Sequence, residues 1–151
     1  MNLERLNQAI AIMERAKVKN SVDMRRWQGG NINNAAVKLK EVELNECRTT
    51  ACFAGHIAVS PEFQAIGGRV GELGVPLLAG DVAAPAIHKW LEISSLNNKT
   101  YVTDLIFGNL CNKEIDGDYQ PSYSQFYDKP WHEVNAQDVI DKLLILRDLN
   151  Y

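Results

Sequence analysis

The residues best suited to chemistry lie together in residues 47–56, which contain two thiols, one imidazole, one guanidinium and two threonine hydroxyls. A helix is expected to begin here, and its free backbone amides and dipole favour an anion. Arg48 would add a charge-assisted hydrogen bond. Arg48, Thr49 and Thr50 are therefore candidate ligands for a phosphate or carboxylate. The competing interpretation pairs Arg48 with Glu46 or leaves it in solvent.

The thiols and the imidazole are also potential metal ligands. On a helix Cys52 and His56 are one turn apart, and Cys47 would supply a third ligand from the preceding segment. Structural zinc sites usually present a close cysteine pair and a second pair of ligands, whereas the spacing here is Cys-x4-Cys-x3-His. We therefore expect no metal and no other cofactor, and keep Cys47, Cys52 and His56 as the alternative metal set.

Cys52 is also a candidate nucleophile, because the positive end of a helix lowers a thiol pKa and His56 could accept the proton. Its neighbours Ala51, Phe53 and Ala54 are apolar, however, and an apolar environment raises a thiol pKa. Buried cysteine behaves as a small hydrophobic residue. We therefore favour packing for Cys52, while His56 is either a core histidine or part of the anion site.

Arg25 and Trp27 combine a positive charge with a ring able to stack on a base. The alternative for Trp27 is a core anchor at the edge of a helix. Together with residues 48–50 and His56 they complete a candidate site for a nucleotide-like anion.

Two segments of the chain together resemble short phage and bacterial proteins of unsettled function. Those proteins share Met-x-x-Trp and, further along, Cys-Gly-Thr-x-x-Cys-x-Ala-Gly-His or Trp, followed by helices that bear Leu and Phe. The matching residues are Met24, Trp27, Cys47, Thr49, Cys52, Ala54, Gly55 and His56, with Leu91 and residues 105–107 similar to the downstream part. Arg48 replaces the usual glycine, so a role that needs a left-handed backbone there does not carry over. The resemblance implies a phage accessory origin and no defined activity.

Hydrophobic spacing and capping signals indicate that helices position these residues. Residues 68–81 have other signals, since their glycines, Pro76 and apolar residues indicate a partly buried loop with at most a short strand pair. The predicted helices span residues 3–17, 51–59 with Thr49 or Thr50 as cap, a short stretch from Ser60–Pro61 to Gly67, a stretch opened by Pro85, residues 99–107 after a turn at 96–98, and a last helix started by Asn135 and Asp138.

Strand signals are few. Residues 37–40 and 42–44 alternate apolar with charged side chains, which suits two short strands. Residues 109–130 are predicted to form a long surface loop pinned by aromatic rings. Residues 114–118 are similar to part of a calcium loop, but Tyr123 stands where the bidentate Glu is needed, so we predict a turn. The fold class expected is mainly α: one compact domain over residues 1–151, with about five helices and at most a small β-hairpin.

Composition bounds the function. The chain has 151 residues, 46% hydrophobic and 23% charged, which is typical of one soluble globular domain. It has 16 Lys and Arg against 19 Asp and Glu, so we do not expect nucleic acid as a partner. Short apolar runs predict no membrane contact and a cytoplasmic protein, in the host cytoplasm if phage-encoded. Three irregularly spaced cysteines favour reduced thiols.

We therefore expect a phage-type accessory binding protein, with anti-defence as its inferred purpose. It would sequester a small anionic, nucleotide-like ligand or block a host protein. One alternative is a metal- or thiol-dependent enzyme that uses Cys47, Cys52 and His56. Another is a helical homo-oligomer whose interface is the broad apolar face of the C-terminal helix, which includes Leu143.

The anion site predicts a measurable loss on substitution of Arg48. Arg48→Ala should weaken nucleotide binding by about 1–3 kcal/mol, the range for a charge-assisted hydrogen bond, and leave the fold intact. Thr49→Ala should also lower stability by about 1 kcal/mol if Thr49 caps the helix. Calorimetric titration with mono-, di- and cyclic nucleotides measures the loss of affinity, and urea unfolding measures the loss of stability. Equal binding by wild type and Arg48→Ala would remove the site.

Overall fold

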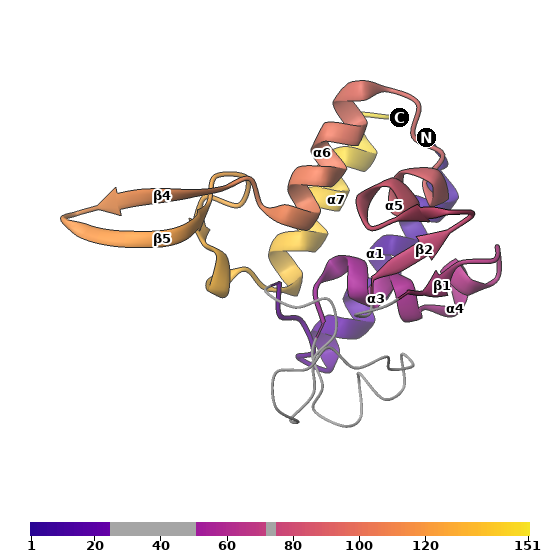
Figure 1. Cartoon of the computed structure of the whole chain (residues 1–151), viewed down its shortest axis with the longest axis horizontal. Helices are drawn as coiled ribbons and strands as arrows, with labels where there is room; N and C mark the ends of the chain where they lie inside the picture. Colours follow the sequence, from indigo (N-terminus) through magenta and orange to yellow (C-terminus); the bar gives the residue numbers. More distant parts are fainter. Residues whose placement is uncertain (25–50, 72–74) are drawn as a thin grey trace.

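A helical body and a projecting β-hairpin make up the part of the chain that the computed structural model describes, residues 1–24, 51–71 and 75–151 (Figure 1). None of the described helices has both the length and the hydrophobicity needed to cross a membrane. The helices are α1 (Leu3–Val18), α3 (Phe53–Val59), α4 (Pro61–Gln64), α5 (Ala84–Trp90), α6 (Leu96–Phe107) and α7 (Ala136–Asp148), with a 3-10 turn η2 (Trp131–Glu133).

Two antiparallel sheets accompany the helices. Strands β1 (Arg69–Val70), β2 (Pro76–Leu78) and β3 (Asp81–Val82) form a small sheet in the order β1-β2-β3. Strands β4 (Leu110–Ile115), β5 (Asp118–Ser124) and β6 (Lys129–Pro130) form the second sheet in the order β4-β5-β6. The prediction of a mainly α domain with at most one hairpin is therefore wrong, and the fold is α+β.

The largest correction concerns residues 109–130, which form strands β4 to β6 and not a surface loop. The turn between β4 and β5 consists of Asp116 and Gly117, with φ values of +50° and +84°. A two-residue hairpin turn of type I′ needs positive φ at both positions, and Asp-Gly is a favoured pair for it. The predicted turn at 114–118 is confirmed, and Asp116–Gly117 was the signal for the hairpin.

The predicted helices are largely confirmed, and their boundaries follow from caps. Ser60 Oγ accepts from Phe63 N at 3.3 Å and starts α4. Asn135 and Asp138 form the expected capping box of α7. The predicted turn at 96–98 is wrong, because α6 already begins at Leu96, directly after Ser95.

The expected threonine cap of α3 is also wrong. Helix α3 begins at Phe53, its N-cap is Cys52, and no side chain caps it. Ala51 forms a parallel β-bridge with Val22, and Cys52 has an extended ψ of 175°. The extended backbone at 51–52 therefore delays the helix past the position that Thr49 or Thr50 could cap. The strands predicted at 37–40 and 42–44 lie outside the described residues.

Helices α1 and α7, from the two ends of the chain, pack against each other in the centre of the core. Leu6 and Met13 of α1 are completely buried, as are Leu143 and Leu146 of α7. Leu143 and Leu146 are thus covered by the chain itself, whereas Leu149 at the end of the same helix is 70% exposed. The homo-oligomer interpretation stays a prediction.

A glycine pair tests how the hairpin is joined to the body. Gly108, the left-handed C-cap of α6, has φ +75°, and a Cβ there would overlap the ring of Trp131. Gly117 has φ +84° and open space around it. Both alanine substitutions should lose about 1 kcal/mol from the backbone conformation, and Gly108→Ala should lose about 1–3 kcal/mol more because a buried ring must move. Urea unfolding measures the difference. Equal losses would contradict this packing.

Candidate functional site

The described residues that flank 25–50 in the sequence meet at the start of α3. Ala51 N donates to Ser21 O at 3.0 Å, and Asp23 N donates to Ala51 O at 3.0 Å. Met24 and Cys52, from the two halves of the sequence motif, are buried in the same hydrophobic cluster. The pairing of Ser21–Asp23 with Ala51 therefore brings the two motif segments together.

His56 strengthens this pairing from inside the core. Its side chain is 1% exposed, and Nε2 lies 2.8 Å from Ser21 O. A carbonyl oxygen only accepts, so Nε2 carries a proton and donates it. Ser21 O thus accepts from both Ala51 N and His56 Nε2. The imidazole ties α3 to the segment that follows α1, and this nitrogen is not presented to a ligand.

Burial also sets the protonation of the two titratable residues. It lowers the pKa of His56 to about 4, with the Ser21 carbonyl opposing the shift and the positive charge of Arg15 adding to it. It raises the pKa of Cys52 to about 11, although backbone amides of Gly55 and Ala54 act in the opposite direction. At neutral pH the imidazole is therefore uncharged and the thiol protonated. A protonated, buried thiol is a poor nucleophile.

The structure describes none of the other predicted site residues. Among the described residues, no group of three or more His, Cys, Asp or Glu side chains is arranged to hold a metal ion. The anion site and the metal set stay predictions. The members of these two sets that lie outside the described ranges are Arg25, Trp27, Cys47, Arg48, Thr49 and Thr50.

The feature that sequence reasoning missed is the hairpin arm, defined as β4, β5 and their turn (residues 110–124), which projects from the body (Figure 1). Most of its side chains are exposed, with Tyr119 64% and Leu110 46% accessible. Antiparallel sheets usually cover one face with a core, and an isolated two-stranded hairpin is marginally stable in water. The arm therefore depends on its attachment to the body.

Buried hydrogen bonds make that attachment. Ser124 Oγ donates to Gly108 O at 2.5 Å and accepts from Tyr127 N at 3.2 Å. Tyr127 OH donates to Leu105 O at 2.8 Å, which joins the base of the arm to α6. Trp131 lies beside Tyr127, with ring centroids 5.9 Å apart. The inner end of the arm is thus fixed against the C-terminal end of α6.

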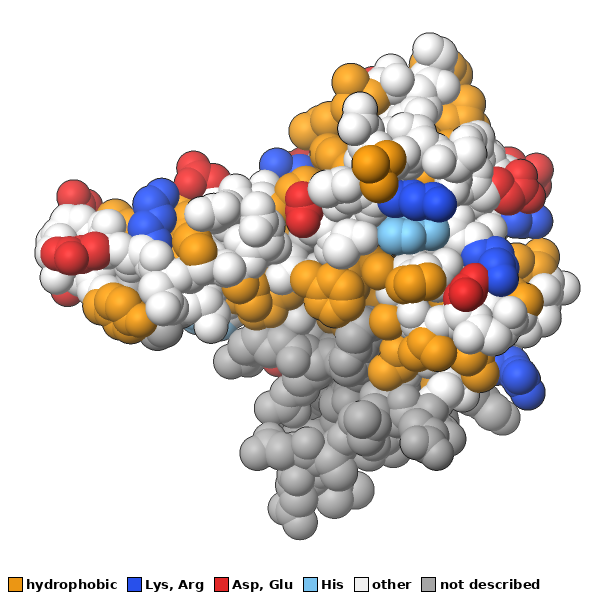
Figure 2. Space-filling view, turned by 45° about the horizontal axis from the view of Figure 1, so that its top comes forward, with side chains coloured by type: hydrophobic (Ala, Val, Ile, Leu, Met, Phe, Trp, Pro, Cys, Tyr) orange, Lys and Arg blue, Asp and Glu red, His pale blue; other side chains and the backbone are white. Residues whose placement is uncertain are grey.

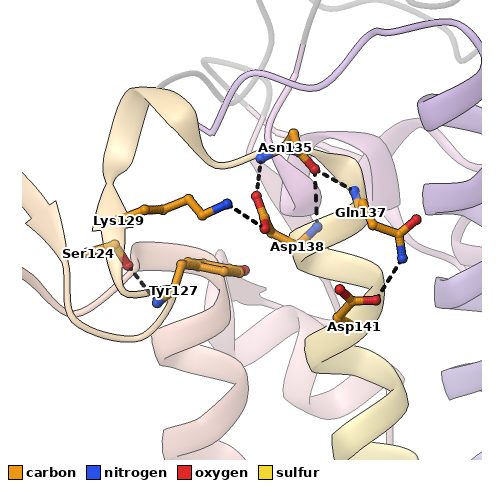
Figure 3. A network of polar contacts seen from close by, with 7 residues as sticks. All are labelled: Ser124, Tyr127, Lys129, Asn135, Gln137, Asp138 and Asp141. Carbon is orange, nitrogen blue, oxygen red and sulfur yellow. Dashed lines mark hydrogen bonds and ion pairs between the residues drawn. The ribbon is translucent and has the colours of Figure 1, made fainter.

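A second attachment reaches α7 (Figure 3). Lys129 Nζ donates to Asp138 Oδ1 at 2.7 Å, while Asp138 Oδ2 accepts from Asn135 N at 2.9 Å. Asn135 Oδ1 in turn accepts from Gln137 N and Asp138 N. Asp138 therefore completes the helix cap and holds β6 at the same time. Because β6 pairs with β5, the direction of the arm is set by two helices.

The outer half of the arm carries an acidic surface. Glu114, Asp116 and Asp118 are exposed there with Lys113 as the one cation, which gives a net charge of −2 for residues 110–119 (one positive against three negative). Figure 2 shows acidic side chains gathered at the end of the projection. Exposed carboxylates beside the Tyr119 ring suit contact with a basic surface.

The comparisons with other proteins give no relative: no protein-family model, no curated protein and no solved structure matches this chain significantly.

The buried imidazole predicts an acid-sensitive fold. Because the folded pKa of His56 (about 4) is below the unfolded value of 6.5, the unfolded state binds more protons between these pH values. Stability should be complete above about pH 6.5 and fall by about 3 kcal/mol as the pH drops to 4. His56→Gln keeps a donor for Ser21 O and does not titrate, so its unfolding free energy should fall less steeply. Urea unfolding measures the free energy of unfolding of both proteins across this pH range. Because both contain His88, the difference between them gives the contribution of His56. Parallel pH profiles would show that His56 is not buried in its neutral form.

Proposed function

We propose that this chain is a binding protein, not an enzyme, and that it blocks a partner protein with the hairpin arm. The observation that carries the proposal is a hairpin that is exposed along its outer half and fixed at its base to α6 and α7. Such a hairpin contributes little apolar burial beyond Tyr123 and its neighbours at the base. Core packing therefore does not account for its length, whereas contact with a partner does.

The charges on the arm support a partner with a basic surface. Glu114, Asp116 and Asp118 would complement lysines and arginines and speed encounter by electrostatic attraction. Tyr119 adds an exposed ring with few rotatable bonds, a residue type enriched in the centre of protein interfaces. The narrow arm suits a groove or pocket on the partner more than a flat surface.

Side chains, not added strands, would make this contact. Within the described residues β4 pairs with β5 alone and leaves its other edge without a partner strand. The register of β4 shifts between Cys111 and Lys113, and charged Lys113 and Glu114 follow. Bulges and charged residues are devices that protect an edge strand from pairing with another chain.

The biological context that we propose for this binding comes from the motif resemblance. The chain would be a phage accessory protein that acts in the host cytoplasm, and blocking a basic host protein would serve anti-defence. The buried, neutral His56 and the protonated Cys52 support a binding role over the thiol-enzyme alternative.

Site-specific photo-cross-linking in bacterial cells tests the proposal. A photoreactive phenylalanine analogue replaces Tyr119 or, as a control, Tyr151, which is 85% exposed outside the arm. We expect a discrete adduct with another protein from position 119 and none from position 151. An adduct of twice the chain mass would overturn the partner-protein proposal in favour of self-association.

A charge-reversal pair tests the chemistry of that contact. Asp118→Lys and Asp148→Lys each change the net charge by +2, one on the arm and one at the end of α7. Asp118→Lys should weaken binding of the purified cross-linked partner about tenfold or more, and Asp148→Lys should leave it unchanged. Equal affinities would contradict recognition by the arm.

A further inference from the structure

A cleft of about 510 Å³ on the body brings basic side chains of α5 and α6 together. Its polar lining consists of His88, Lys89, Lys99, Asp81 and Glu92. Figure 2 shows a histidine at the surface of the body with basic side chains beside it. No lining residue belongs to the arm or to the sequence motif, so this surface is separate from the proposed protein contact.

The acidic residues of the cleft are each neutralised by a neighbour. Asp81 Oδ2 lies 2.5 Å from Lys89 Nζ, and Glu92 Oε1 lies 2.9 Å from an Arg5 guanidinium nitrogen. Lys99 forms no ion pair with a described residue. Once the paired charges cancel, the cleft keeps the positive charge of Lys99.

His88 is held beside α6 by a chain of hydrogen bonds. Thr103 Oγ1 donates its one proton to Lys99 O at 2.9 Å and lies 3.2 Å from His88 Nε2. The hydroxyl oxygen can therefore accept from Nε2–H, which fixes the tautomer of the neutral ring. Protonation of the remaining nitrogen, Nδ1, would add a second positive charge beside Lys99.

We propose that this cleft binds a phosphate group between Lys99 and His88. Phosphate has oxygens for several donors at once, and the flexible ammonium groups of lysine bind it as point charges. Burial and the charge of Lys99 lower the pKa of His88, although the Lys99 carbonyl opposes this. A bound dianion would counteract the effect of Lys99 and favour the imidazolium form. The group could come from inorganic phosphate or from a nucleoside monophosphate.

Titration of the histidine ring protons by nuclear magnetic resonance tests the site. The midpoint for His88 should rise by about half a pH unit or more in inorganic phosphate, compared with chloride at equal ionic strength. His132, which is exposed outside the cleft, serves as the internal control and should not move. An unchanged His88 midpoint, or equal shifts for both histidines, would overturn the proposal; equal shifts would show an adventitious ion only.

Two lysine variants distinguish phosphate binding in the cleft from a general effect of positive charge. Lys99→Gln should abolish the phosphate-dependent rise at His88, while Lys19→Gln, at an exposed position after α1, should retain it. Unchanged thermal unfolding of both variants confirms that the fold is intact. A rise that survives Lys99→Gln contradicts the proposal.

Repeating the titration with adenosine monophosphate identifies the source of the phosphate. A response at lower concentration than with inorganic phosphate assigns the cleft to a nucleotide, and an equal response assigns it to free phosphate. Either result supports the cleft as an anion site. Failure of the arm to bind a protein would leave this result unaffected, since the two surfaces share no residue.

Discussion

One carbonyl oxygen, that of Ser21, controls how the sequence motif is arranged in space. It accepts from Ala51 N and from His56 Nε2, so it joins the segment after α1 to the start of α3. A buried carbonyl and a buried imidazole would each carry a desolvation cost without a partner, and here they satisfy each other. The pairing therefore holds the described residues on either side of 25–50 against each other.

The surroundings of Cys52 and His56 show why the sequence suggested reactive side chains where the structure has buried, neutral ones. Cys52 and His56 have the side chains of a metal site or a nucleophile–base pair, and their spacing allowed both. Ala51, Phe53 and Ala54 indicated an apolar environment, which is what the structure has. In that environment both residues are neutral, and the imidazole has a structural hydrogen-bond acceptor. The sequence could not show that acceptor, because Ser21 is 35 residues away in the chain.

The success and failure of the fold predictions have one physical origin. Helices α1 and α7 bury one face each, so their apolar residues recur at helical spacing and were found, and the Asn135–Asp138 capping box marked the start of α7. Strands β4 and β5 bury neither face along most of their length, so no alternation of apolar and polar residues was required. Only the turn chemistry of Asp116–Gly117 remained as a signal. The cleft was equally hidden, because His88 and Lys99 come from different helices and only their packing brings them together.

The attachment of the arm has a consequence for the proposed contact with a partner protein. A hairpin that became ordered only on contact would lose conformational entropy at that moment and bind more weakly for the same contacts. Two hydrogen bonds reduce that loss, because they order the base of the arm in the free protein. Tyr127 OH bonds to Leu105 O in α6, and Lys129 Nζ bonds to Asp138 in α7. Gly108, with its left-handed backbone, contributes to the same attachment, because the absence of a side chain there lets Trp131 pack against the end of α6. If the arm makes the proposed contact, stability and recognition are coupled at this junction. A substitution at the base would then lower affinity by loosening the direction of the arm, even though none of these residues would touch the partner.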